Sequence, residues 1–192
     1  NFVVPHGMWY NPNEVYIPPL VSPYSKKLAP ALPGYSNFVG RSCMLLQGGK
    51  RVANIGVLYP FEELAGWYRF EDPENPRQGF FVSPETNYLE ISGLLTNDIR
   101  QDFTFIHPEY FLDNKYEIDQ GSVLLNNSEN KQKYSALILT GCKIISLKTL
   151  QKLKDYYVKG GLVISAGQLP FKSSEIGQDE KVKALILEIF GV

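Results

Sequence analysis

Residues 134–169, YSALILTGCKIISLKTLQKLKDYYVKGGLVISAGQL, decide the fold class of this chain. The apolar runs at 136–139 and 162–167 are each typical of a strand buried in a parallel sheet. Between them, Ser146 is placed to cap a helix with an apolar face, and Gly160-Gly161 is placed to end it. Two parallel strands joined by one helix require a right-handed crossover, so this stretch predicts an α/β sheet.

The flanking sequence supplies more elements for the same sheet. Strands that alternate with helices predict an α/β fold, an open and mostly parallel sheet of about four to five strands with helices on both faces. We expect a flavodoxin-like order, in which the second strand lies beside the first, followed by the third and the fourth. The expected elements are helices at 35–46, 85–100 and 179–190, strands at 51–59 and 102–106, a brief helix at 108–113, a hairpin around Gly121 and a polar surface turn at 126–133.

Residues 1–34 have a different composition from the rest of the chain. They hold seven of the 13 prolines, and proline at this density is incompatible with a regular helix or a central strand. We therefore divide the chain into an extended, Pro- and aromatic-rich arm at 1–34 and an α/β domain at 35–192. The arm has more aromatic residues than a solvated linker needs, so we expect it to pack against a neighbour.

The composition excludes several classes of function. The net charge is −1, with 19 Lys and Arg against 20 Asp and Glu, which gives no electrostatic basis for binding nucleic acid or an anionic membrane. No apolar run reaches the roughly 18 residues of a membrane span. Nothing at the N-terminus reads as a secretion signal, so the compartment stays unknown. The chain opens with Asn1, which favours a processed protein or a fragment of a longer one.

Residues 61–84 are expected to form a long loop at the end of a sheet strand, where α/β proteins often bind ligands. Trp67, Tyr68 and Phe70 form either a platform for stacking carbohydrate or a hydrophobic anchor for the loop. The acids of the loop either bind sugar hydroxyls or a cation, or form a solvated rim. These acids are Glu62, Glu63, Glu71, Asp72 and Glu74.

Cys142 follows a predicted strand, as the nucleophile does in glutamine amidotransferase-like domains. Such a nucleophile needs glycine on both sides, and here Ile144 stands where the second glycine belongs. It also needs a histidine base, for which His107 at another strand end is the candidate. Lys143 could lower the pKa of the thiol. The plainer interpretation is that Cys142 is a small buried residue. Neither GxGxxG nor a P-loop occurs, so we expect no nucleotide cofactor. Cys43 and Cys142 are isolated and lack Cys or His at ligand spacing, so we expect no metal.

Several motifs resemble one region of large bacterial glycoside hydrolases of the α-L-rhamnosidase type, and of related β-galactosidases. The motifs are HGMWYNP at 6–12, PPLVSPY at 18–24, YSNFVGRSCMLLQGGKRVANIGVLYP at 35–60 and ALILTGCKIISLKTLQKLKDYYVKGGLVISAG at 136–167. In that family, a TIM barrel with the catalytic carboxylates precedes an α/β domain that resembles class I glutamine amidotransferases but lacks their chemistry. The resemblance implies that the arm is the tail of the barrel, and that the parent protein is secreted or periplasmic. No carboxylate pair here matches the family's catalytic residues, so none is carried over.

Three functions remain open on the sequence. The first is a non-catalytic accessory domain beside the upstream barrel of the same parent chain, with a role in packing, homo-oligomer contacts or the rim of the sugar site. The second is a stand-alone module that binds carbohydrate or another small molecule in a crevice at the strand ends. The third is a cysteine-dependent, amidotransferase-like enzyme. The candidate binding residues are Tyr59, Glu62, Trp67, Tyr68, His107 and Cys142.

Overall fold

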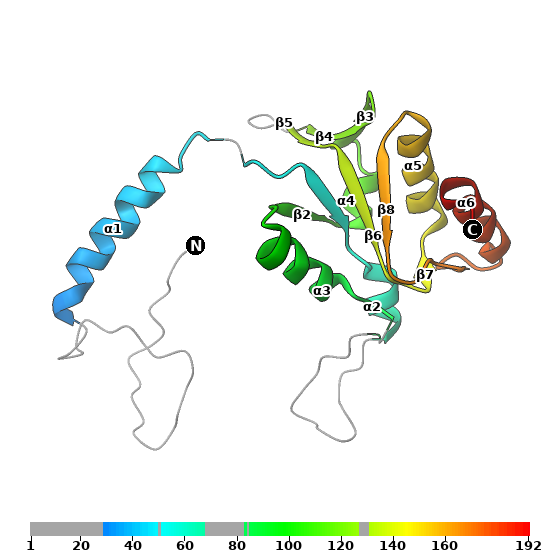
Figure 1. Cartoon of the computed structure of the whole chain (residues 1–192), viewed down its shortest axis with the longest axis horizontal. Coiled ribbons are helices and arrows are strands. Elements are labelled where there is room, and N and C mark those ends of the chain that lie inside the picture. Colours follow the sequence, from blue (N-terminus) through cyan, green and yellow to red (C-terminus); the bar gives the residue numbers. More distant parts are fainter. Residues whose placement is uncertain (1–28, 50, 68–82, 84, 127–130) are drawn as a thin grey trace, which may run out of the picture. The chain divides into compact units, whose positions relative to one another are not determined.

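The structure is a computed structural model that describes residues 29–49, 51–67, 83, 85–126 and 131–192 (Figure 1). The chain divides into two compact units, 1–49 and 50–192. Residues 1–28 of the predicted arm lie outside the described residues, as does most of the stretch between 68 and 84.

The described part of the first unit is helical. A 3-10 turn, η1 (Ala29–Ala31), leads into α1 (Leu32–Leu45), so the helix begins three residues earlier than predicted. Residues 29–34 are consequently not extended. Pro33 lies in the first turn of α1, where its missing N–H would have no partner within the helix, and so it does not break the helix.

The second unit contains a four-stranded parallel sheet in the order β2-β1-β6-β8. These strands correspond to the four predicted at 51–59, 102–106, 136–139 and 162–167. The predicted order, with the second strand beside the first and then the third and the fourth, is confirmed. Strand β1 is shorter than predicted, since its ladders with β2 and β6 begin at Ile55 and residues 51–54 do not join them. The strands are β1 (Ile55–Leu58), β2 (Phe103–Ile106), β6 (Ala136–Thr140) and β8 (Leu162–Ala166).

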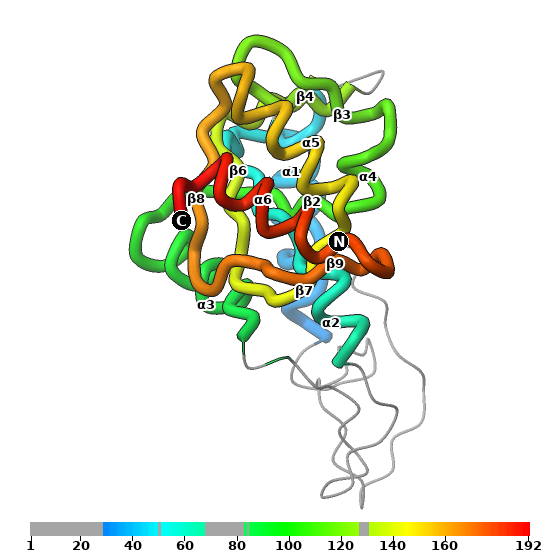
Figure 2. The backbone as a smooth tube through the Cα atoms, turned by 90° about the vertical axis from the view of Figure 1, so that its right-hand side faces the viewer, coloured from blue at the N-terminus to red at the C-terminus, as the bar shows by residue number. Residues whose placement is uncertain are grey.

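Helices cover both faces of this sheet, as predicted. One face packs on α5 (Leu147–Val158) and α6 (Asp179–Phe190) around Leu137, Leu153 and Val182, which are fully buried. The other face packs on α3 (Tyr88–Gly93) and the π-helical turn η2 (Leu94–Ile99). Figure 1 shows α3 and α5 on opposite sides of the strands, and Figure 2 shows α5 and α6 in front of β6 and β8.

Two smaller sheets complete the unit. The predicted hairpin around Gly121 is present as β3 and β4, but part of the predicted polar turn at 126–133 is wrong, because β5 adds a third antiparallel strand. A short parallel pair, β7 with β9, was not predicted. The elements are α4 (Pro108–Leu112), β3 (Tyr116–Asp119), β4 (Ser122–Asn126), β5 (Lys131–Tyr134), β7 (Ile144–Ile145) and β9 (Lys172–Ser173).

The turn between α5 and β8 depends on both of its glycines. Gly160 has φ of +85°, a left-handed conformation that side chains with Cβ disfavour. At Gly161, a Cβ atom would lie 2.3 Å from the ring of Tyr156, which is fully buried. The prediction that Gly160-Gly161 ends the helix is therefore confirmed, and the second glycine is required for packing.

The predicted loop at 61–84 is wrong in its first part, because residues 61–67 form α2 (Phe61–Trp67). Pro60 precedes this helix, and Glu62 and Glu63 lie in its first turn, where acidic side chains favour a helix N-terminus. Helix α2 therefore begins directly at the carboxyl end of β1 and places both acids at the edge of the sheet.

Candidate functional site

The carboxyl ends of β1, β2 and β6 meet at one edge of the sheet. Leu58 is in register with both Ile106 and Leu139, so the residues that follow these three strands are neighbours. This edge is where ligands bind in open α/β sheets.

Glu63 occupies the centre of this edge and is fully buried. Its Oε2 atom accepts hydrogen bonds from the backbone N–H groups of Lys143 (2.8 Å) and Ile144 (3.0 Å), and its Oε1 atom accepts one from the hydroxyl of Ser83 (2.7 Å). Two backbone N–H groups that could face a substrate after β6 are therefore bound by the protein's own carboxylate. The interpretation of Glu63 as part of a solvated rim is wrong.

Asn87 binds the backbone N–H of Gly141, which lies just before the segment that Glu63 binds. Its Oδ1 atom accepts the N–H of Gly141 (2.8 Å), and its amide donates to the carbonyl of Ala166 (2.9 Å). A Cβ atom on Gly141 would lie 2.5 Å from the carbonyl oxygen of Glu85, so the backbone after β6 is tightly enclosed. Asn87 thus joins the ends of β6 and β8.

The N-terminus of α5 is also bound from within the chain. Glu175 accepts hydrogen bonds from the N–H of Leu147 (2.8 Å) and the hydroxyls of Ser146 (2.9 Å) and Ser173 (2.5 Å). Burial opposes ionisation of Glu175, but these hydrogen bonds outweigh it and lower its pKa to about 2. Ser146 occupies the predicted N-cap position, although its hydroxyl binds Glu175 and makes no cap within the helix. A carboxylate from the chain takes the place that an external anion would occupy.

Cys142 is buried beneath these groups, with 2% of its surface exposed. Burial, followed by the negative charges of Glu63 and Glu62, raises the pKa of the thiol to about 12. Lys143, which the sequence suggested as a group that lowers this pKa, forms an ion pair with Glu85 (2.5 Å). The thiol is therefore held in its neutral form, whereas a cysteine nucleophile requires a thiolate.

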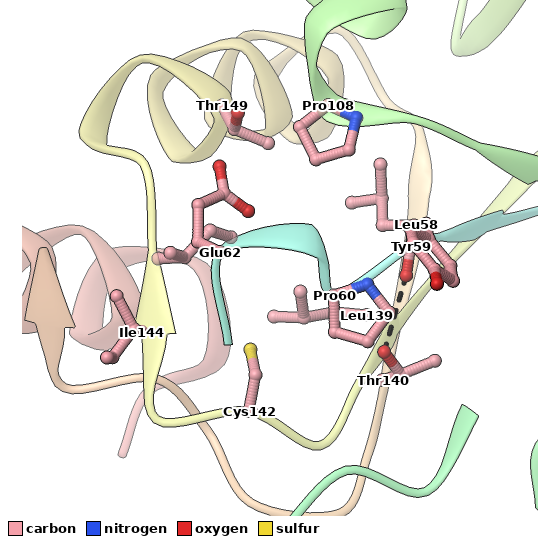
Figure 3. A pocket seen from close by; sticks show the side chains of 11 residues that line it. Leu58, Tyr59, Pro60, Glu62, Pro108, Leu139, Thr140, Cys142, Ile144 and Thr149 are labelled. Atoms are coloured by element: carbon pink, nitrogen blue, oxygen red, sulfur yellow. Dashed lines mark hydrogen bonds between the residues drawn. The ribbon is translucent and has the colours of Figure 1, made fainter. Parts of the chain in front are cut away.

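A small cavity lies between the ends of these strands and α5. Its volume is about 10 Å³, which matches a single water molecule and is far below the roughly 300 Å³ of a typical ligand site. Burial raises the pKa of Glu62 at its wall. Figure 3 shows the Glu62 side chain pointing towards Thr149, whose buried hydroxyl has no hydrogen-bond partner among the described residues. The cavity is lined by Leu58, Tyr59, Pro60, Glu62, Pro108, Leu139, Thr140, Cys142, Ile144, Ile145 and Thr149.

Aromatic rings gather beside the cavity, at the ends of β1 and β2. The imidazole of His107 stacks on Tyr59 (centroids 6.2 Å apart, planes at 27°) and contacts Phe61 (4.7 Å) and Tyr110 (6.0 Å). Its Nδ1 atom accepts the N–H of Glu109 (3.3 Å), which caps α4. We call Tyr59, Phe61, His107 and Tyr110 the aromatic cluster; Phe61 is 40% exposed and Tyr110 is 56% exposed.

Known proteins share little sequence with this chain. No protein-family model matches it, and no curated protein matches it. Among solved structures, it is similar to the crystal structure of a beta-galactosidase from Bifidobacterium adolescentis, with 15% sequence identity and a TM-score of 0.44. The similarity covers 74% of this chain and 56% of that chain, so the chain spans a little over half the length of its structural neighbour.

The structure brings some of the predicted site residues together and separates others. Tyr59, Glu62 and Cys142 line the cavity, and His107 lies in the aromatic cluster next to it. Trp67 ends α2 and is 37% exposed. Tyr68 lies outside the described residues, as do Phe70, Glu71, Asp72 and Glu74. The groups that the sequence did not single out are Ser83, Asn87 and Glu175.

No described helix is both long and apolar enough to cross a membrane. Within the part of the chain that the structure describes, no group of three or more His, Cys, Asp or Glu side chains is arranged to hold a metal ion.

Proposed function

We propose that this chain is a non-catalytic α/β accessory domain of a glycoside hydrolase, with a role in packing, oligomer contacts or the rim of the sugar site of a neighbouring barrel. The observation that carries this proposal is the binding of the backbone N–H groups at the carboxyl edge of the sheet. Those of Lys143 and Ile144 bind Glu63, that of Gly141 binds Asn87, and that of Leu147 binds Glu175.

Internal binding of these groups argues against catalysis at this edge. Enzymes of acyl transfer keep such donors open for the charge that develops in the transition state. A glycosidase needs two carboxyl groups on either side of a bound sugar, about 5 to 9.5 Å apart. Of the adjacent acids, Glu62 borders a cavity of about 10 Å³, which is too small for a sugar ring, and Glu63 is fully buried.

The raised pKa of Cys142 also argues against the amidotransferase-like alternative. A thiol with a pKa of about 12 is almost entirely protonated at neutral pH. His107, the candidate base, binds the N–H of Glu109 through Nδ1 and stacks within the aromatic cluster.

The glycoside hydrolase part of the proposal is supported by the motifs at 6–12, 18–24, 35–60 and 136–167, which resemble the region after the barrel in that family. The sugar and the stereochemistry of the parent enzyme would be determined by its barrel. The test is to express the barrel encoded in the same reading frame separately and mix it with this chain. We expect a stable complex in size-exclusion chromatography, and separate elution at micromolar concentrations would overturn the proposal.

The aromatic cluster favours a second candidate function, which is carbohydrate binding. Exposed aromatic rings stack on the apolar faces of sugars, and Phe61 and Tyr110 both present such rings in contact with His107. Titration of a Trp9→Phe variant, whose remaining tryptophan is Trp67, with galactose and rhamnose tests this function, followed by tryptophan fluorescence and by NMR shifts of the aromatic rings. Saturable changes that Phe61→Ala and Tyr110→Ala abolish would support carbohydrate binding. Spectra that stay unchanged up to about 50 mM sugar would exclude binding with a dissociation constant below roughly that concentration.

A further inference from the structure

Strand β8 is one border of the four-stranded sheet. It pairs with β6 on one side, and no described strand pairs with its other side. Its sequence, LVISA, contains no charged residue and no proline. Native proteins protect exposed edge strands with such residues, because unpaired backbone groups recruit further strands.

The other sheet edges carry this protection. On β2, the N–H of Phe103 donates to Asp102 (3.0 Å) and its carbonyl accepts from Arg51 (2.9 Å), so a charged pair binds the backbone groups at the start of that strand. The two edges of the antiparallel sheet carry charged side chains, and these are Glu117 and Asp119 on β3 and Lys131 and Lys133 on β5. Among the described edges of these two sheets, β8 is therefore the exception.

The backbone groups at the outer edge of β8 can be identified. The carbonyl of Ala166 binds Asn87, which also binds Gly141 after β6, and the carbonyl of Gln168 accepts the N–H of Cys142 (3.2 Å). The carbonyl of Ala166, the last residue of β8, is thus directed towards β6. Because successive residues of a strand alternate, Val163 and Ser165 direct theirs to the outer edge.

We propose that β8 pairs with β8 of a second copy of this chain, antiparallel and across a two-fold axis at Ile164. In this register Val163 lies opposite Ser165 of the second copy, and the N–H and carbonyl groups of both residues exchange hydrogen bonds. The symmetry repeats the pair on the other side of the axis, so four hydrogen bonds join the copies. Ile164 faces its own equivalent as a pair without hydrogen bonds, in which side chains lie closest.

The side chains fit this pairing. Leu162 is 55% exposed and Ile164 is 42% exposed, although both belong to a strand of the main sheet. The pairing places Leu162 opposite Ala166 of the second copy and Ile164 opposite Ile164, which forms an apolar row without like charges. The two sheets then continue as one. The pairing rests on the oligomer contact included in the proposed function and assigns it to one strand.

The first test is the mass of the chain in solution. Sedimentation velocity over a series from about 1 to 100 μM should show a dimer whose share rises with the concentration of the chain. Ile164→Lys would place two like charges opposite each other, and we expect at least tenfold weaker association. Phe105→Lys is the matched control, since Phe105 is 40% exposed on the opposite edge, and it should leave the dimer intact. A monomeric wild-type chain, or a dimer unaffected by Ile164→Lys, would overturn the pairing.

A crosslink tests the register. In a Cys43→Ser background, which removes the exposed native thiol, Ile164→Cys places two thiols within disulfide distance across the axis. We expect a covalent dimer on mild oxidation, and none for Phe105→Cys in the same background. Failure of Ile164→Cys to crosslink would exclude the proposed register. Neither result affects the complex with the barrel, which is measured separately.

Discussion

The carboxylate of Glu63 accepts the backbone N–H of Lys143 at 2.8 Å, across 80 residues of sequence. This contact joins the first turn of α2 to the segment that follows β6. It fills, with a buried side chain, the position at which related folds bind substrates. The Glu63 carboxylate therefore both stabilises the carboxyl edge of the sheet and occupies the backbone N–H groups that a ligand would need.

Replacement of Glu63 should destabilise the chain. Glu63→Gln keeps the size of the side chain but removes its charge and replaces one of its two acceptor oxygens with an NH₂ donor, so its buried, charge-assisted hydrogen bonds are weakened. We expect a loss of about 2 to 4 kcal/mol in the free energy of unfolding, measured with urea. The control is Glu90→Gln on the exposed surface of α3, which should change it by less than about 0.5 kcal/mol. Equal effects of the two substitutions would show that the Glu63 contacts are not formed.

Thiol reactivity tests the environment of Cys142. Burial raises the pKa of this thiol to about 12, whereas Cys43 is exposed. With Ellman's reagent at pH 8, we expect one thiol to react rapidly in the folded chain and two in guanidinium chloride. Cys43→Ser should remove the rapid phase. Rapid reaction of two thiols in the folded chain would contradict the buried position of Cys142.

Glu175 should give the chain a specific dependence on pH. Its pKa is about 2 in the folded chain, below the ordinary value of 4.5, so its ionised form stabilises the fold above about pH 4.5. That contribution is lost as the pH falls from 4.5 towards 2. The difference in unfolding free energy between wild type and Glu175→Gln should therefore be largest near neutral pH and shrink across this window. A difference that stays constant from pH 7 to pH 2.5 would contradict the contacts of Glu175.

Gly161 should not tolerate a side chain. Gly161→Ala places a Cβ atom 2.3 Å from Tyr156, whose hydroxyl is held by the carbonyl of Ser135 (2.9 Å). We expect a loss of about 1 to 3 kcal/mol by overpacking. Gly66→Ala is the control, because that glycine lies in a helix with open space around it and alanine favours helices. Thermal unfolding of both variants measures the difference, and a neutral Gly161→Ala would show that the turn is looser than described.

The sequence was sufficient to predict the parallel sheet and its order. The reason is that short local patterns mark the strands and helices from which the sheet is built. The apolar strands at 136–139 and 162–167, and the helix between them, are each visible in a few residues. Helix α2 was missed although Pro60 and two acids mark its start, since the aromatic residues of 61–70 gave no clear period. Strand β5 was missed because its two lysines suggested a solvated turn, while alternate residues, Gln132 and Tyr134, are buried.

The site could not be predicted to the same extent. Cys142 was correctly interpreted as a small buried residue, from the absence of a glycine after it. Glu63, Asn87 and Glu175 bind backbone N–H groups of this edge that lie 28 to 81 residues away along the chain. No local pattern marks a carboxylate that will be buried by a distant segment. Such contacts follow from the packed fold.

Hydrolysis of aryl glycosides by the purified chain tests the central claim most directly. The chain is incubated with 4-nitrophenyl α-L-rhamnoside and with 4-nitrophenyl β-D-galactoside, and the release of nitrophenol is followed. Because the edge of the sheet is bound by the chain's own side chains, we predict release at the rate of buffer alone. Release above that rate, which rises with protein concentration and is lost on Glu62→Gln, would contradict a non-catalytic accessory role.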